Sequence, residues 1–527
     1  MTVASDRLTG TGTAGAREDT YDVVVVGGGL GGLTAGAMLA RSGKKVLVVD
    51  ANERPGGYAR TIVDGPYTFD MADHLIFGCA PESPFGPGVI DAVLRHLDVR
   101  DRCDFFRVDD PFYVARFPDL SLAAPHGREA FVEAHARHFS GEAAGLRHLV
   151  ELSASVAREF AALPIAPSPL DLLEMPLRFP TLFRYRNATV QQVIDATLTD
   201  PRAKAAYLAL WPWMGRPARS SFLIWATMMA YYVEDGAYYC RGGFQSLADA
   251  LADGLRLAGG QLLLATRVTG ILVDGGQVRG VALDNGQQVR AQVVISNVDA
   301  RDTFGQLIDA HDVPARYLRR LRAMERSMAV VALHLATDLD VRALGATLET
   351  MLYAAWHDAE TSYAAALAGQ VPLLAVRIPT LMDPSLAPTA EHAVTVAALA
   401  APAGGEGTVA DGDRLAARML ELAEGMLPGL RNHLTHVEGA ESGVTRFPLH
   451  RMEPIYGWAL SPAQSGPRRL PQTTPVPGLY LAGHWTRPAH GVPMVIQSGV
   501  QAARLILGIA PRASALPLRL PSLTPVG

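Results

Sequence analysis

The sequence has only three cysteines, Cys79, Cys103 and Cys240, and no two of them form a C-x-x-C pair. A disulfide-rich scaffold, a zinc ribbon and a dithiol redox site each need more cysteines or closer ones, so all three are excluded. The motifs H-E-x-x-H and G-x-S-x-G, typical of zinc peptidases and of hydrolases with a serine nucleophile, are also missing. We therefore expect neither a metal centre nor a hydrolytic nucleophile.

A surplus of positive charge is absent as well. The 47 Lys and Arg residues against 52 Asp and Glu give a formal net charge of −5, so a nucleic-acid partner is not expected. The first twenty residues are small and polar, without the apolar segment of a signal peptide. The longest apolar run, Phe222–Val233, is interrupted at Thr227 and has twelve residues, fewer than the roughly 18–20 that span a bilayer. These absences predict a cytoplasmic protein whose contact with membranes is at most peripheral.

A pattern of strand, helix and strand lies near the start of the chain. The β-branched run Val23–Val26 leads into a glycine-rich loop, and an Ala- and Leu-rich helical stretch follows over Leu33–Ser42. Gly43 is suited to end that helix, and a second β run, Lys45–Val49, ends on Asp50. This order is typical of a βαβ unit of about thirty residues.

The glycine-rich loop carries G-x-G-x-x-G at Gly27, Gly29 and Gly32. In this setting the first glycine permits a tight turn, the second lets the backbone approach a pyrophosphate, and the third allows the helix to pack on the strand. The phosphates would lie at the free N–H groups of the helix N-terminus. Asp50, eighteen residues beyond Gly32, ends the second strand, where an acid accepts hydrogen bonds from a nucleotide ribose. Together these features predict a dinucleotide site.

Further strands are indicated in the second half of the chain. Turns of the D-G and N-G type separate alternating runs and predict hairpins. The runs are Gln261–Leu264, Val268–Val273, Gln277–Leu283 and Gln288–Ser296. Near the end, Gly478–Leu481 predicts a short buried strand and Val492–Leu507 a helix. At 527 residues the chain has room for two or three packed units, given about 100–200 residues per domain.

Three motifs together resemble those of the FAD-dependent flavoprotein superfamily that includes amine oxidases and phytoene desaturases. They are the first glycine loop, Glu53-Arg54-Pro55-Gly56-Gly57 after the second strand, and Gly478–His484 leading through Gly491-Val492-Pro493 into a helix. Within the superfamily, the sequence is most similar to bacterial phytoene desaturases, carotenoid cis–trans isomerases and all-trans-retinol saturases. Further landmarks in family order are Tyr67–Asp70, Phe77-Gly78, Arg241–Phe244, Thr266, Val268, Ile295–Asn297, Tyr456–Trp458 and Gly491–Gly499.

The resemblance implies an α/β fold with a discontinuous, Rossmann-like FAD-binding domain and an inserted α+β substrate domain. The FAD domain would be assembled from residues 21–110, 236–305 and 441–510, and the substrate domain from 111–235 and 306–440. Residues 1–20 would form a flexible N-terminus and 511–527 a loose C-terminal tail.

The resemblance also implies which residues hold FAD. The glycine loop would bind the pyrophosphate, Asp50 the ribose, and Val268 the adenine through its backbone. The implied set is Gly27, Gly29, Leu30, Gly31, Gly32, Asp50, Ala51, Arg54, Gly56, Gly57, Tyr58, Val268, Gly483, Val492, Pro493 and Met494. Two positions depart from the usual family pattern: Tyr58 stands where Arg is frequent, and His484 where an acid is frequent.

Redox chemistry at carbon–carbon bonds needs little from side chains, because flavin N5 accepts or delivers the hydride. No second G-x-G-x-x-G is present to hold a nicotinamide nucleotide. The ionisable candidates for catalysis beside the expected flavin are Asp73, His74, His484 and His490. A histidine there could protonate a polyene or stabilise developing charge, and each could equally be a hydrogen-bonded structural group.

Two apolar stretches leave alternatives open. Leu208–Val233, rich in Trp, Met and Tyr, is either ordinary core or the wall of a substrate channel. Leu170–Asn187 interleaves apolar residues with Arg178, Arg184 and Arg186, a pattern that suits an anionic membrane surface or a solvated surface segment.

The function expected from these features is FAD-dependent oxidation or reduction of an apolar polyene or isoprenoid by desaturation, saturation or isomerisation. Oxygen or a quinone would serve as electron acceptor in a desaturation. One rival is an amine oxidase-like flavoenzyme or a natural-product tailoring oxidase. Another is a prenyl-lipid carrier without catalysis, which the intact glycine loop disfavours.

Overall fold

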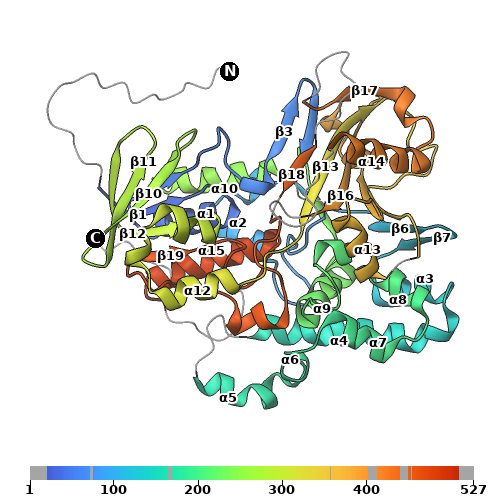
Figure 1. Ribbon diagram of the computed structural model, residues 1–527, viewed down its shortest axis with the longest axis horizontal. Helices are drawn as coiled ribbons and strands as arrows, with labels where there is room; N and C mark the ends of the chain where they lie inside the picture. Colours follow the sequence, from blue (N-terminus) through green and yellow to red (C-terminus); the bar gives the residue numbers. More distant parts are fainter. Residues whose placement is uncertain are drawn as a thin grey trace.

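The computed structural model describes residues 20–71, 75–163, 169–356, 358–401, 412–439, 449–452 and 454–509. Two β-sheets form its framework (Figure 1). The sheet that contains β1 lies on the left of the view, and the sheet that contains β13 lies at the upper right. Helices α1 and α15 pack beside the first sheet, and a helical layer with α4 and α9 lies below the second. The predicted α/β fold class is confirmed.

The first sheet has the strand order β10-β11-β12-β1-β2-β9, with β19 paired to β12. Pairing is parallel between β1, β2, β9, β12 and β19, and β10, β11 and β12 form an antiparallel meander. The strands are β1 Thr20–Val26, β2 Val46–Val49, β9 Gln261–Leu263, β10 Val268–Asp274, β11 Gln277–Leu283, β12 Gln288–Ser296 and β19 Leu479–Leu481. The predicted βαβ unit and hairpins are therefore confirmed, with strand ends that agree to within a residue except at the start of β1, which begins three residues before the predicted run.

The second sheet has the order β17-β13-β16-β15-β14-β6-β7, with β18 paired to β13. Its strands are β6 Tyr113–Phe117, β7 Leu120–Ala124, β13 Ala329–Thr337, β14 Glu349–Tyr353, β15 Leu373–Arg377, β16 His392–Ala400, β17 Leu434–Val437 and β18 His450–Met452. Strand β13 is buried on both faces, because one face packs on α14 and the other on the large core shared with the helices. Strand β18 lies within residues 441–510 yet pairs with this second sheet, so the division into domains stays a proposal.

Two small antiparallel pairs and the helices complete the fold. The pairs are β3 Thr61–Asp64 with β4 Tyr67–Asp70, and β5 Phe105–Arg107 with β8 Tyr238–Cys240. The helices are α1 Leu30–Arg41, α2 Val89–His96, α3 Arg128–Ala136, α4 Ala143–Ala162, α5 Pro169–Arg178, α6 Pro180–Tyr185, α7 Val190–Thr197, α8 Pro201–Tyr207, α9 Phe222–Ala230, α10 Gln245–Leu257, α11 Ala300–Asp302, α12 Ala315–Ala323, α13 Ala359–Leu367, α14 Gly412–Met426 and α15 Val492–Ile506. Among the described residues, no helix combines the length and the apolar character that crossing a membrane requires.

Candidate cofactor and substrate site

Helix α1 begins directly at the glycine loop and presents a free N-terminus. Gly27 has φ +96°, a backbone conformation that side chains rarely adopt, and this turns the chain from β1 toward α1. Gly29 is the N-cap, no side chain caps the helix, and its first turn holds no acid. The first N–H groups and the positive end of the helix dipole are therefore available to an anion.

Close backbone contacts fix the position of this loop. A Cβ on Gly32 would lie 2.3 Å from the carbonyl oxygen of Gly27, and a Cβ on Gly31 would lie 2.8 Å from the backbone nitrogen of Gly483. A Cβ on Gly499 in α15 would lie 2.4 Å from the carbonyl oxygen of Gly31. Only glycine fits at these positions, and the result is that α1, α15 and the loop after β19 meet at one point.

Asn297, directly after β12, reaches into the same point. Its Oδ1 atom is buried and has no hydrogen-bond partner among the described residues. A Cβ on Gly29 would lie 2.6 Å from Asn297 Nδ2, and a Cβ on Gly483 would lie 2.6 Å from Asn297 Oδ1. The amide therefore stands between the two glycine-rich segments with an acceptor left over for a bound ligand.

Asp50 joins the end of β2 to the glycine loop. Its Oδ2 accepts a hydrogen bond from the N–H of Gly28 at 2.6 Å, and its Oδ1 accepts two bonds from Asn52, each 2.7 Å long. The carboxylate is 6% exposed. It is thus held in one orientation by the backbone on both sides.

A cavity of about 520 Å³ extends from this loop to the N-terminus of α15. Binding sites for small molecules commonly have about 300–1,000 Å³. One part is lined by backbone, which we call the glycine cradle: Gly29, Leu30, Gly31, Gly56, Gly57 and Gly483. Another part is lined by large apolar side chains, which we call the apolar wall: Leu75, Ile76, Phe77, Phe160, Trp213, Met214, Ile224, Met228, Tyr232, Ile455 and Tyr456.

Most of the predicted site residues line this cavity. Outside the glycine cradle they are Tyr58, His484, His490, Val492, Pro493 and Met494. Ala51 is exposed and Val268 is buried at the start of β10, and neither is among the lining residues. Arg54 is not among the lining residues and its guanidinium lies 3.5 Å from Asp249, so its place beside the flavin stays a prediction. Asp73 and His74 lie outside the described residues.

The two positions that depart from the family pattern are neighbours. The ring centroids of Tyr58 and His484 are 6.0 Å apart, and both side chains line the cavity. Behind His484 lies the fully buried Arg469, whose guanidinium donates to the carbonyl oxygens of Trp458, His484 and Thr486. Burial lowers the pKa of His484 to about 3, and the charge of Arg469 acts in the same direction. A protonated His484 is therefore not expected at neutral pH.

His490 is held in a similar way. Its ring stacks on Tyr456 with 4.2 Å between centroids, and Nε2 lies 3.2 Å from the carbonyl oxygen of Trp213. Burial lowers the pKa of His490 to about 3, again reinforced by Arg469. Burial and a nearby cation disfavour the imidazolium in both rings, so neither is expected to carry a proton to a polyene at neutral pH, and the catalytic roles of His484 and His490 stay predictions.

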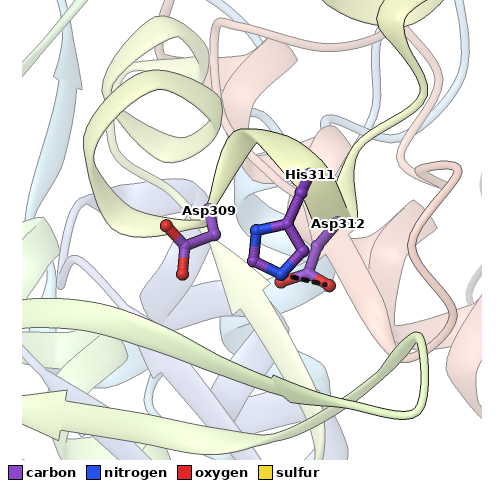
Figure 2. Close-up of side chains that lie close together, drawn as sticks. All are labelled: Asp309, His311 and Asp312. Atoms are coloured by element: carbon purple, nitrogen blue, oxygen red, sulfur yellow. Dashed lines mark ion pairs between the residues drawn. The ribbon is translucent and has the colours of Figure 1, made fainter.

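One small group of side chains of the kind that bind metals lies elsewhere, around the turn Ala310–Asp312. Asp309, His311 and Asp312 have ligand atoms within 4.8 Å of one another, and His311 and Asp312 are the ion pair drawn in Figure 2. Asp309 and His311 are exposed, and none of the three lines the cavity. Exposed acidic groups of this kind are common without an ion, so we assign no metal site to them.

The family model described as "Flavin containing amine oxidoreductase" matches residues 30–507. The chain belongs to this flavoprotein family. A phytoene desaturase (neurosporene-forming) of Rhodobacter capsulatus is 28% identical over 92% of this chain and 93% of its own. Prolycopene isomerase 1 of an Oncidium hybrid cultivar is 27% identical over 94% of this chain and 86% of its own. An all-trans-retinol 13,14-reductase of Macaca fascicularis is 26% identical over 70% of this chain and 63% of its own.

Solved structures of other oxidoreductases share the fold of this chain. An oxidoreductase from Methanosarcina mazei superposes on this chain with a TM-score of 0.61 at 17% identity. The match covers 91% of this chain and 98% of the Methanosarcina chain. A putrescine oxidase variant gives a TM-score of 0.59 at 15% identity, over 93% of this chain and 99% of its own. Family and fold together make this protein an FAD-dependent oxidoreductase.

The described residues fit FAD. The uncapped N-terminus of α1 suits the pyrophosphate, the unpaired Oδ1 of Asn297 suits a buried donor, and the glycine cradle leaves the room that side chains would fill. When bound, FAD supplies a site at N5 that accepts or delivers hydride. The chain itself would position the cofactor through the backbone of the glycine cradle, and the apolar wall would exclude water.

Asn297 and Arg469 belong to the site, but the sequence motifs assign neither of them a role in binding or catalysis. Asn297 was only part of the landmark Ile295–Asn297, although a polar residue directly after a buried parallel strand is itself a signal. Arg469 has no local signal, because its three carbonyl partners are brought to it only by the fold.

Proposed function

We propose that this flavoprotein exchanges hydride between FAD and a carbon–carbon bond of an elongated apolar substrate of the polyene or isoprenoid class. The observation that carries the proposal is the apolar wall, which shares one cavity with the glycine cradle. Burial of an apolar chain stabilises the complex by about 0.8 kcal/mol for each CH₂ group, so such a wall favours long hydrocarbon chains. Relatives named for phytoene, prolycopene and all-trans-retinol support the same substrate class.

Desaturation, saturation and isomerisation would use this arrangement in different ways. Desaturation removes a hydride and a proton from adjacent carbons, and the two electrons then leave to an acceptor such as oxygen or a quinone. Saturation adds a hydride and a proton to a double bond and needs a reductant. Isomerisation returns the electrons to the substrate without net redox change. Because burial lowers the pKa of His484 and of His490 to about 3, neither ring is expected to supply the proton of a saturation, which would come from solvent or from another ionisable group.

The experiment uses purified, FAD-loaded protein with phytoene, prolycopene and all-trans-retinol. Loss of the oxidised flavin absorbance on anaerobic mixing, with a product two hydrogens lighter, indicates desaturation. A geometric isomer formed only after chemical reduction of the flavin indicates isomerisation, and a product two hydrogens heavier indicates saturation. No change in any of the three substrates, aerobically or anaerobically, contradicts the proposal.

The amine oxidase alternative has less support. A protonated amine needs a carboxylate or a cage of aromatic rings near the flavin. The described acids that line the cavity, Asp299 and Asp302, are not part of the apolar wall, whereas Tyr232 and Tyr456 of that wall could face a cation. The relatives named for phytoene, prolycopene and all-trans-retinol favour the polyene class over an amine. Putrescine and benzylamine should therefore leave the flavin oxidised. A purified protein without bound flavin would instead favour the lipid-carrier alternative.

We also propose that α5 contacts the surface of a membrane. Helix α5 projects from the lower edge of the molecule (Figure 1), and its Leu173 and Leu177 are 77% and 85% exposed. Exposed leucines on a projecting helix suit insertion at a lipid surface. The double variant Leu173→Gln/Leu177→Gln should lose binding to phosphatidylglycerol vesicles in a sedimentation assay. Leu257→Gln, at an exposed leucine on α10, is the matched control and should bind as the wild type does.

A further inference from the structure

His490 lies where the apolar wall meets a second, smaller cavity. It is 8% exposed and precedes α15 by two residues. The smaller cavity, about 40 Å³, shares Met214, Tyr456 and His490 with the main cavity, and polar residues such as Arg216, Ser220 and Ser327 line it as well. About 10–15 Å³ already holds one water molecule, so a hydroxyl group fits in this space.

The hydrogen bond to Trp213 determines which nitrogen of His490 carries the proton. A carbonyl oxygen only accepts, so Nε2 must donate to Trp213 across the 3.2 Å between them. A neutral ring has one N–H, and Nδ1 is therefore an acceptor with a free lone pair. Nδ1 is buried and has no hydrogen-bond partner among the described residues. The site thus contains a fixed acceptor that no described donor satisfies.

We propose that His490 is a specificity-determining residue whose Nδ1 accepts a hydrogen bond from a substrate hydroxyl, so that the cavity prefers a polyene alcohol to the hydrocarbon of the same skeleton. This inference rests on the proposed function, because it assumes a polyene in the cavity. His490 contacts Trp213 and Tyr456 of the apolar wall, and it also lies two residues before Val492, which is expected to hold FAD, so it stands where the substrate and the flavin would meet.

The hydroxyl group matters because a buried acceptor is costly when it is left unpaired. A hydrocarbon covers Nδ1 without satisfying it, whereas an alcohol donates to it. The affinity of the alcohol should therefore exceed that of the hydrocarbon by about tenfold to a hundredfold. An ether of the same alcohol keeps the oxygen but has no proton to donate, so it should bind like the hydrocarbon.

The test measures dissociation constants for three probes by quenching of tryptophan fluorescence in the FAD-loaded protein. The probes are all-trans-retinol, its methyl ether and its deoxy hydrocarbon. We expect the wild type to bind retinol about ten- to a hundredfold more tightly than the other two. His490→Phe should bind all three alike, with the affinity for the hydrocarbon kept or improved. His490→Asn, which keeps an acceptor on a short side chain, should retain part of the preference.

Flavin content and melting temperature, measured on the same preparations, separate the outcomes. Equal binding of the three probes by the wild type overturns this inference and leaves the proposed function standing. A loss of affinity for all three in both variants identifies His490 as packing only. A changed flavin spectrum with unchanged probe selectivity means that Nδ1 faces the cofactor, which also overturns the inference. Binding of none of the probes by the wild type removes the proposed function and the inference together.

Discussion

The backbone N–H of Gly28 donates a hydrogen bond to Oδ2 of Asp50 across 2.6 Å. This bond joins the loop that begins α1 to the end of β2, and the other oxygen of Asp50 holds Asn52. The acid that the sequence assigns to a ribose therefore also fixes the backbone on which the pyrophosphate would lie.

The first prediction concerns this carboxylate. Asp50→Ala should weaken FAD binding by about tenfold to a hundredfold, since a hydrogen bond to a charged acceptor contributes about 1.5–3 kcal/mol. Equilibrium dialysis of the apoprotein with FAD measures the effect. Asp22→Asn is the matched control, because Asp22 accepts the N–H of Lys45 at the exposed end of the same strands and should leave FAD affinity unchanged. Equal effects of the two substitutions would contradict the assignment.

The second prediction tests the contact between Gly31 and Gly483. In Gly31→Ala the new Cβ would lie 2.8 Å from the backbone nitrogen of Gly483, so α1 must separate from the loop after β19. We expect a cost of about 1–3 kcal/mol in the free energy of unfolding and a loss of bound flavin. In Gly425→Ala, inside α14, the Cβ meets open space, so that variant should gain stability by about 0.4–1 kcal/mol and keep its flavin. Absorbance and thermal unfolding give both quantities.

The local architecture of the nucleotide site could be predicted because its signals are local. Val23–Val26, the glycine loop and Asp50 each follow from residues a few positions apart, and the hairpins from D-G and N-G turns. The place of Asn297 could not be predicted in the same way, because its contacts with Gly29 and Gly483 join segments about two hundred residues or more apart.

The protonation states of His484 and His490 could not be predicted from the sequence either. A histidine beside the expected flavin is a candidate proton donor because its ordinary pKa lies near neutral pH, but the fold lowers the pKa of His484 and His490 to about 3 by burying them near Arg469. The sequence also does not show that Met228 lines the cavity whereas Met229 and Trp225 do not. Which of these side chains faces the cavity depends on how α9 is rotated against its neighbours.

The third prediction concerns the pH dependence of stability. Burial raises the pKa of Asp70 to about 6, although Tyr239 and the N–H of Phe244 donate to it. Between about pH 4 and pH 6 the native state keeps a proton that the unfolded state has released, so the free energy of unfolding falls as the pH rises. The total loss from a shift of this size is about 3 kcal/mol.

Asp70→Asn removes this titration while keeping a group of the same shape. The difference in unfolding free energy, wild type minus variant, should therefore decrease between pH 4 and pH 6 and stay constant above pH 7. Urea unfolding at a series of pH values measures it, and all other titrating groups cancel in the difference. A difference that is flat or rises with pH would mean that Asp70 is ionised throughout.

The last prediction uses two adjacent methionines of α9. Both are buried and belong to the large core, but Met228, 6% exposed, lines the cavity as part of the apolar wall, whereas Met229, 2% exposed, is absent from the lining. Met229→Ala should lower the free energy of unfolding by about 2–5 kcal/mol, because it leaves a cavity among packed side chains. Met228→Ala should change stability much less, since that side chain already faces space that a substrate would fill. The same variant should instead bind longer or bulkier polyenes more tightly than the wild type does. Thermal unfolding and probe binding, measured on the same preparations, separate the two roles. If Met228→Ala destabilises the protein as much as Met229→Ala and leaves polyene binding unchanged, Met228 is an ordinary core residue. The substrate must then lie elsewhere.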